Sequence, residues 1–190
     1  TPRLTRDGFP AVVLAPDGHA AIDRLRGGGI DLVLSDLRMP GLNGLELLRE
    51  VKTISPDLDV IMLTAFASVA TAVAHLGRLD VLVNNAGIGA VARALETPLA
   101  TYDAIMDVNV RGAFRYAQAC FPHLERTGGS MIQVASDAGV SGEAEIAIYS
   151  VSKAALIMLS NMLAIEGGRL GVRSNAVCPG DTAPGMRHMV

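Results

Sequence analysis

The sequence predicts a three-layer, doubly wound α/β domain with a mainly parallel sheet of about six strands. Short runs of Val, Ile and Leu alternate with stretches of helical period, and several of these runs lack a strict apolar-polar alternation. Strands that are buried on both faces of a parallel sheet have this composition. The β-α-β-α order favours right-handed crossovers, which place helices on the faces of one sheet.

The expected elements follow in chain order from this pattern. We expect strands over residues 11–15, 31–35, 60–64, 81–84, 130–135 and 172–178. We expect helices over residues 18–26, 42–53, 67–76, 99–124 and 146–166. The three glycines at positions 27–29 precede a strand and are read as a helix stop, because a phosphate-binding turn would follow a strand.

Composition argues against several classes of partner. The net charge is -3, and no Lys/Arg cluster indicates a nucleic-acid surface. The first residues lack an apolar signal core, and we expect that no apolar run reaches the length of a membrane span. Cys120 and Cys178 both lie in apolar segments, so we expect free, buried thiols. The expectation is a cytoplasmic protein without nucleic-acid or membrane partners.

Two polar residues end neighbouring predicted strands in the first third of the chain. Asp36 stands at the carboxyl end of one strand, and Thr64 ends the next. Ligand chemistry concentrates at this edge of open α/β sheets. A carboxylate beside a hydroxyl suits an aspartyl-phosphate whose phosphoryl oxygen the hydroxyl binds. The alternative is that Asp36 is a relic carboxylate without a metal ion.

Residues from about 4 to 70 resemble a response-regulator receiver domain. The resemblance rests on S-D-L-R-M-P-G at residues 35–41, G-L-E-L-L at 44–48 and L-T-A-F at 63–66. It implies that Asp36 is the phosphoacceptor and Thr64 the switch hydroxyl. The acidic pair that holds Mg²⁺ in receivers, and the Lys that ends their fifth strand, have no counterpart here. We therefore expect no metal site, and Mg²⁺ binding is not expected.

A second candidate site begins with Tyr149 and Lys153. Positions i and i+4 share one helix face, so the phenol and the ammonium project together. A cation about 4 Å away stabilises a phenolate by roughly 4 kcal/mol at an effective dielectric near 20. This would bring the pKa of Tyr149 toward neutrality and suit it to exchange a proton with a carbonyl/alcohol pair. The alternative is an inherited but idle pair.

Residues from about 67 to 190 resemble the short-chain dehydrogenase/reductase family. Besides Tyr149 and Lys153, the match includes Ser136 after a strand and Asn109 inside a helix. It also includes N-N-A-G and P-G, each at the end of a strand. The resemblance implies that Asn109, Ser136, Tyr149 and Lys153 are catalytic. The cofactor-binding residues that it implies are Asn84, Asn85, Ala86, Gly87, Tyr149, Lys153, Pro179, Gly180 and Thr182.

Each residue takes its expected role from the same resemblance. Tyr149 would be the general acid/base, and Lys153 would lower its pKa and hold the nicotinamide ribose. Ser136 would bond the substrate carbonyl, and Asn109 would anchor a water of the proton relay. The cofactor would be NAD or NADP, and the long helices 99–124 and 146–166 would pair two subunits into a homodimer.

The glycine-rich turn that opens the dehydrogenase family has no match before residue 84, where Asp17-Gly18 offers a single glycine. We therefore interpret residues 1–190 as one flavodoxin-like/Rossmann-like hybrid domain, a chimera of a receiver-like segment 1–70 and a dehydrogenase-like segment 71–190. Three hypotheses follow. They are a chimeric fold without full activity, an NAD(P)-dependent oxidoreductase with residual activity, and a phospho-accepting signalling module. An alternative to the chimera is that N-terminal residues precede the sequence given.

Overall fold

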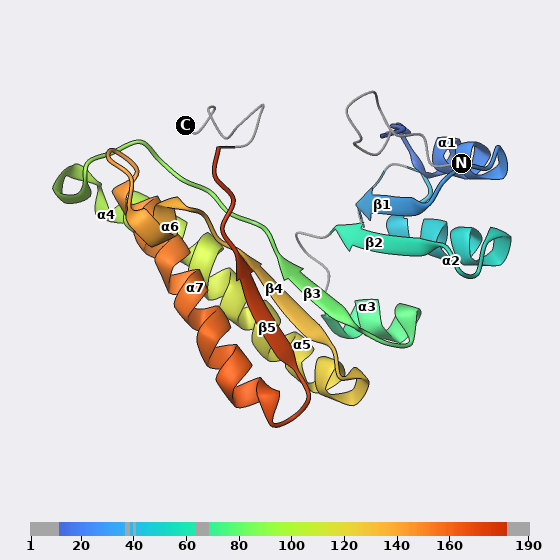
Figure 1. The fold of residues 1–190 in the computed structure, drawn as a ribbon. Coiled ribbons are helices and arrows are strands. Elements are labelled where there is room, and N and C mark those ends of the chain that lie inside the picture. The colour runs from blue at the N-terminus through green and yellow to red at the C-terminus, as the bar shows by residue number, and fades with distance from the viewer. Residues whose placement is uncertain (1–11, 37–38, 40, 64–68, 182–190) are drawn as a thin grey trace. The chain divides into compact units, whose positions relative to one another are not determined.

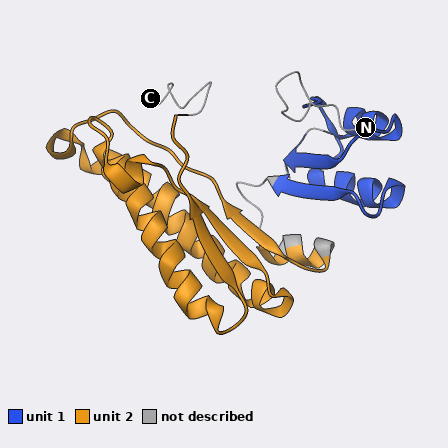
Figure 2. Cartoon of the chain, viewed as in Figure 1, with its two compact units in different colours: residues 1–68 blue, residues 69–190 orange. Residues whose placement is uncertain are grey.

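The computed structural model describes residues 12–36, 39, 41–63 and 69–181 of the chain. It divides into two compact units, unit 1 with residues 1–68 and unit 2 with residues 69–190 (Figure 2). Each unit is described by itself. That the two segments form one α/β domain stays a prediction.

Unit 1 contains two βα repeats whose helices begin at side-chain caps. Asp17 accepts a hydrogen bond from the Ala20 N–H at 2.9 Å. Asn43 and Glu46 form a capping box, in which each side chain accepts from the backbone of the other residue. The elements are α1 (Gly18–Arg26), β1 (Leu32–Asp36), α2 (Gly44–Ile54) and β2 (Asp59–Leu63).

The two strands of unit 1 pair in parallel, and one face of the pair is covered. Ile22, Leu47 and Val51 from α1 and α2 form a buried cluster, against which the inward residues of the strands pack. Leu34 and Ile61 lie opposite one another on the other face, where they are 60% and 46% exposed. The amphipathic helices therefore account for burial on one face of this sheet.

Unit 2 holds a second parallel sheet with the order β3-β4-β5. Its strands are β3 (Val81–Asn84), β4 (Ser130–Val134) and β5 (Arg173–Val177). Its helical elements are α3 (Val69–Leu76), the 3-10 helix η1 (Ala94–Glu96), α4 (Leu99–Met106), the π-helix η2 (Asp107–Gly112), α5 (Ala113–Thr127), α6 (Ala138–Ser141) and α7 (Ala147–Gly168).

Helices α5 and α7 lie on one face of this sheet (Figure 1). Leu124, Met131 and Leu156 are buried between the helices and the strands. On the opposite face Val83 and Val177 are each 49% exposed. Apolar burial on the covered face therefore holds the site elements together.

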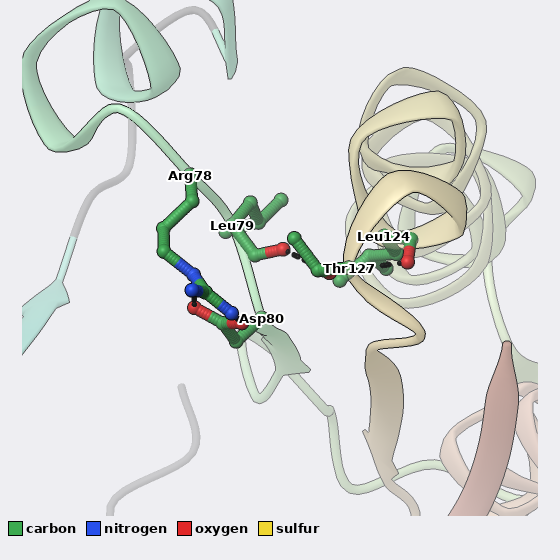
Figure 3. Close-up of polar contacts among 5 residues, drawn as sticks. All are labelled: Arg78, Leu79, Asp80, Leu124 and Thr127. Atoms are coloured by element: carbon green, nitrogen blue, oxygen red, sulfur yellow. Dashed lines mark hydrogen bonds and ion pairs between the residues drawn. The ribbon is translucent and has the colours of Figure 1, made fainter.

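Hydrogen bonds tie the end of α5 to the entry of β3. Thr127 Oγ1 donates to the Leu79 carbonyl at 2.8 Å and to the Leu124 carbonyl at 3.1 Å (Figure 3). Beside them Arg78 Nε donates to Asp80 Oδ2 at 2.9 Å on the surface. Such an exposed ion pair adds little stability, so the part-buried Thr127 contacts matter more here.

The structure corrects the expected elements at two places. Residues 12–15 form no strand, because no described strand lies beside them to complete a hydrogen-bonded ladder. Residue 11 of that expected strand lies outside the described residues. The helix expected over 99–124 is instead three consecutive helical segments, with the π-helix η2 between α4 and α5. The other expected elements are present to within two or three residues at each described end.

Helix α7 is long and apolar enough to cross a membrane, which the sequence reading did not anticipate. One such helix is weak grounds for a membrane span, since core helices pass the same test. Ser152, Lys153 and Ser160 are buried on α7, and Ser160 shares a hydrogen bond of 3.0 Å with Ser174 of β5. These buried polar contacts are those of a core helix packed on a sheet.

The two cysteines differ in environment, against the expectation that both are buried. Cys120 is buried on α5, and burial raises the pKa of its thiol to about 11. Cys178 is exposed just beyond β5.

Candidate active site

Tyr149 and Lys153 lie in the first turns of α7 and are 7% and 3% exposed. The Lys153 Nζ atom lies 5.5 Å from the centroid of the Tyr149 ring. The same Nζ atom donates to the Val134 carbonyl at the end of β4 at 2.8 Å. The helical spacing thus brings the two side chains together, and the sheet orients the ammonium.

The pKa values of the pair differ from the expectation. The pKa of Tyr149 is raised, mainly by burial, and the carboxylates of Asp137 and Glu143 raise it further, while a hydrogen bond with Ser136 lowers it. Burial lowers the pKa of Lys153. The prediction that Lys153 brings the pKa of Tyr149 toward neutrality is therefore wrong for this state, because desolvation outweighs the cation.

Asn109 is fully buried in the π-helix η2 and uses its whole amide group. Its Oδ1 accepts from the Ile88 N–H at 2.8 Å, and its Nδ2 donates to the Ile88 carbonyl at 2.8 Å. Nδ2 also donates to Ser152 Oγ at 2.9 Å, and Ser152 in turn donates to the Tyr149 carbonyl at 2.7 Å. Asn109 therefore links the segment after β3 to α7. π-Helical turns often occur at functional sites, and this one places the Asn109 side chain between Ile88 and Ser152.

The N-N-A-G segment begins with a buried residue, continues with two exposed ones and ends at the partly buried Gly87. Asn84 is buried, and its Nδ2 donates to Gln133 Oε1 at 2.9 Å and to the Ala113 carbonyl at 3.0 Å. The Asn84 side chain thus joins β3 to β4 and α5. Asn85 and Ala86 are exposed.

Gly87 lies against two of the other site residues. A Cβ atom there would lie 3.2 Å from Lys153 Nζ and 3.4 Å from Asn109 Oδ1. A glycine at this position therefore lets the backbone approach the Lys153 ammonium closely.

Ser136 follows β4, and two acidic residues that the sequence reading missed, Asp137 and Glu143, act on this part of the site. Its Oγ donates to Asp137 Oδ1 at 3.0 Å. Glu143 and Asp137 both act electrostatically on Tyr149. A carboxylate directly after the candidate serine was a signal in the sequence, but only the fold shows that it turns back onto the serine hydroxyl.

The segment after β5 completes the same edge of the sheet. The Asp137 N–H donates to the Pro179 carbonyl at 3.0 Å. A Cβ atom at Gly180 would lie 3.3 Å from Asp137 Oδ2, so Gly180 passes close to this carboxylate. Thr182 lies outside the described residues.

The predicted phosphoacceptor site is described in part. Asp36 ends β1, is exposed and pairs with the last residue of β2, as the order of strands predicted. Thr64 lies outside the described residues. In the part of the chain that the structure describes, no group of three His, Cys, Asp or Glu residues could hold a metal ion.

Parallel strands covered by helices, with polar residues gathered at their carboxyl ends, define an α/β protein of Rossmann-like type. Residues 18–190 match the profile of the short chain dehydrogenases, so the chain belongs to the short-chain dehydrogenase/reductase family. This match runs through the segment that we compared with a receiver domain. It gives no support to a receiver-like segment or to a chimera of segments 1–70 and 71–190.

Individual relatives agree with this family. Meso-2,3-butanediol dehydrogenase of Serratia marcescens is 32% identical over 164 residues, covering 85% of this chain and 65% of that protein. An uncharacterised oxidoreductase of Thermotoga maritima is 45% identical over 107 residues, covering 56% of this chain and 43% of that protein. The chain therefore spans less than two thirds of the length of either relative.

A solved structure shows the fold as well. The crystal structure of NAD+-bound xylitol dehydrogenase is similar with a TM-score of 0.64 and 28% identity, covering 81% of this chain and 61% of that one. The predicted α/β, Rossmann-like fold with parallel strands is confirmed by such similarity.

The described residues suit one end of a nicotinamide cofactor. The Lys153 ammonium and the Tyr149 phenol are hydrogen-bond donors that suit ribose hydroxyls. Because residue 87 is a glycine, no side chain there crowds the ammonium. The N-terminus of α1 does not suit a pyrophosphate, because the Asp17 carboxylate already caps it and would repel a phosphate. The described site residues therefore fit the nicotinamide end of the cofactor, whereas the N-terminus of α1 does not fit its pyrophosphate.

Proposed function

We propose that this chain carries the catalytic part of an NAD(P)-dependent oxidoreductase that interconverts a carbonyl compound and an alcohol. The observation that supports this most is the convergence of Asn109, Ser136, Tyr149 and Lys153 beside the N-N-A-G turn. They come from η2, the end of β4 and α7, and hydrogen bonds or direct contacts connect them.

The proton transfer belongs to Tyr149. When bound, the cofactor would supply a hydride to the substrate carbon or accept one from it. On reduction, Tyr149 Oη gives its proton to the substrate oxygen, and on oxidation the phenolate takes that proton back. The raised pKa of Tyr149 keeps the phenol protonated at neutral pH, which suits the general-acid role.

Lys153 and Asn109 support this transfer in different ways. The ammonium over the Tyr149 ring stabilises negative charge as the phenolate forms. Its bond to the Val134 carbonyl holds it at the sheet edge, where the ribose hydroxyls would bind. Asn109 holds the segment after β3 against α7 and so keeps the site closed on one side.

Nucleotide binding tests the proposal. We expect NADH or NADPH to bind at micromolar concentration in calorimetry, and Lys153→Ala to weaken binding about tenfold. Lys52→Ala is the matched control, since it removes the other lysine, which bonds only carbonyls within unit 1. Tyr149→Phe should keep binding and lose turnover. Absence of binding at millimolar cofactor, with a cooperative thermal melt, would contradict the proposal and favour an inactive scaffold.

The phospho-accepting alternative depends on Asp36 at the end of β1. Treatment with a small phosphodonor and Mg²⁺, followed by mass spectrometry, tests it directly. No mass increase at Asp36 would remove this alternative. The family match across residues 18–190 favours the oxidoreductase over it and over a chimeric fold.

We also propose a cytoplasmic homodimer that pairs through α7. Val151, Met158, Met162 and Ile165 are exposed along α7 at helical spacing. A second copy would cover this apolar stripe. Monomeric mass in light scattering at high protein concentration would contradict the dimer.

A further inference from the structure

The hydroxyl group of Ser136 has three hydrogen-bonding neighbours. Its oxygen lies 3.0 Å from Asp137 Oδ1 and 3.2 Å from the Ala138 nitrogen. Its third neighbour is the Tyr149 phenol. A hydroxyl has one proton and two lone pairs, so each neighbour takes one of them.

Asp137 determines how the hydroxyl is shared. A carboxylate only accepts hydrogen bonds, so the Ser136 proton points to Asp137. The Ala138 N–H occupies one lone pair, which leaves the second lone pair for Tyr149. In this arrangement Ser136 accepts a hydrogen bond at the reacting centre, whereas the family resemblance predicted that it donates one to a carbonyl.

The Asp137 carboxylate is itself held in place. Its Oδ1 accepts from the Ala138 N–H at 2.7 Å, and its backbone N–H donates to the Pro179 carbonyl at 3.0 Å. Gly180 lies close to Oδ2. These contacts connect the start of α6 to the segment after β5, so the carboxylate keeps its orientation toward Ser136.

We propose that Asp137 is a positioning residue of the active site, which holds the Ser136 proton away from Tyr149 and from the substrate oxygen. This inference rests on the proposed function. An alcohol substrate can donate to the lone pair of Ser136 that faces Tyr149, and the bond from Ser136 to Asp137 stays in place. A carbonyl substrate must first draw the Ser136 proton away from Asp137. The resting site therefore favours the alcohol form of the substrate.

Four groups act on the Tyr149 phenol. Comparing them distinguishes an effect of charge on the pKa of Tyr149 from an effect of where the Ser136 proton lies. Lys153 lies over the ring, Asp137 and Glu143 are the nearby acids, and Ser136 shares the hydrogen bond. The bond with Ser136 lowers the pKa of Tyr149 only when Ser136 gives its proton to the phenolate, and Asp137 competes for that proton. In the part of the chain that the structure describes, Glu143 has no hydrogen bond to Ser136. Glu143 is thus a matched control with the same charge.

The experiment is a titration of Tyr149 in the whole protein without cofactor. A difluorinated tyrosine, incorporated at all three tyrosines, makes the phenols more acidic and gives fluorine NMR signals, and Tyr149→Phe assigns the signal. Asp137→Asn and Glu143→Gln are each measured with Ser and with Ala at position 136. Asn at position 137 keeps an oxygen that caps the Ala138 N–H, and a thermal melt of each variant checks the fold.

The proposal predicts coupling between positions 137 and 136. Asp137→Asn should lower the titration midpoint of Tyr149 more with Ser136 present than in Ser136→Ala, because an uncharged amide oxygen holds the serine proton more weakly and the phenolate then competes better for it. Glu143→Gln should lower the midpoint equally in both backgrounds. Equal effects of Asp137→Asn in the two backgrounds would overturn the proposal, since Asp137 would then act by charge alone.

Where a substrate that the protein turns over is found, steady-state kinetics give a second test. Asp137→Asn should lower the KM of the carbonyl substrate relative to that of the alcohol, by about threefold to tenfold. An unchanged KM ratio would also count against the inference. The titration needs neither cofactor nor turnover. A failure of nucleotide binding would therefore refute the proposed function and leave the titration result to decide the role of Asp137.

Discussion

Replacing Asn109 by Ala tests the buried link between the N-N-A-G segment and α7. The substitution removes three hydrogen bonds, two with the Ile88 backbone and one with Ser152. Asn109 has no exposed surface, so protein groups and not water satisfy its amide in the folded state. We therefore expect a loss of stability and a loosened active site.

The magnitude follows from what each partner keeps. A net hydrogen bond contributes about 1 kcal/mol, so three bonds amount to about 3 kcal/mol. Ile88 is 41% exposed, and its backbone groups can bond water instead. Ser152 keeps its bond to the Tyr149 carbonyl. Since no partner is left buried without a bond, we expect a loss of about 2–4 kcal/mol and not more.

Urea denaturation followed by tyrosine fluorescence measures this loss. The chain has no Trp, and its three tyrosines all lie in unit 2, so the signal reports the unit that contains Asn109. Asn161→Ala, at an exposed position of the same unit, is the control and should change the free energy of unfolding by less than about 0.5 kcal/mol. If Asn109→Ala cost less than about 1 kcal/mol, the reasoning on this link would be refuted.

Three further predictions concern the core of unit 2. Gly139→Ala should lower stability by about 1–3 kcal/mol in a thermal melt, because its Cβ would lie 2.7 Å from the Lys153 backbone carbon. Gly168→Ala is its control, has open space and should cost nothing. Gln133→Met should change the free energy of unfolding by no more than about 1 kcal/mol in either direction, because it removes Gln133 Nε2, which is buried without a hydrogen-bond partner, together with Oε1, which accepts from Asn84 Nδ2. A loss above about 2 kcal/mol would contradict this. The raised pKa of Cys120 stabilises the fold below the unfolded value of 9.0, and this contribution should fall as pH rises to about 11, by up to about 2.5 kcal/mol. The difference between wild type and Cys120→Ala in urea melts across this pH range measures it, and a constant difference would refute it.

The helices and most strands could be predicted because their signals are local. Helix period, caps such as Asn43 and Glu46, and short aliphatic runs depend on neighbouring residues in the chain. The expected strand near residues 11–15 carried the same aliphatic signal. A strand also needs a partner for its backbone groups, and no sequence window contains that partner.

The resemblance of the first segment to a receiver domain also arose from local signals. Receiver and dehydrogenase folds both consist of βα repeats with polar residues at strand ends, so short motifs resemble one another. The family match over residues 18–190 assigns that segment to the dehydrogenase family.

By itself the sequence determined the order of βα elements and the identities of Asn109, Ser136, Tyr149 and Lys153 as candidate site residues. Only the tertiary structure decided the environment of each one. It placed Lys153 over the Tyr149 ring, yet raised the pKa of Tyr149 through burial, and it turned Asp137 onto Ser136. Motif spacing reflects covalent connection along the chain. Desolvation depends instead on groups that folding brings together from distant segments, and the sharing of the Ser136 proton depends on the local backbone conformation at residues 136–138.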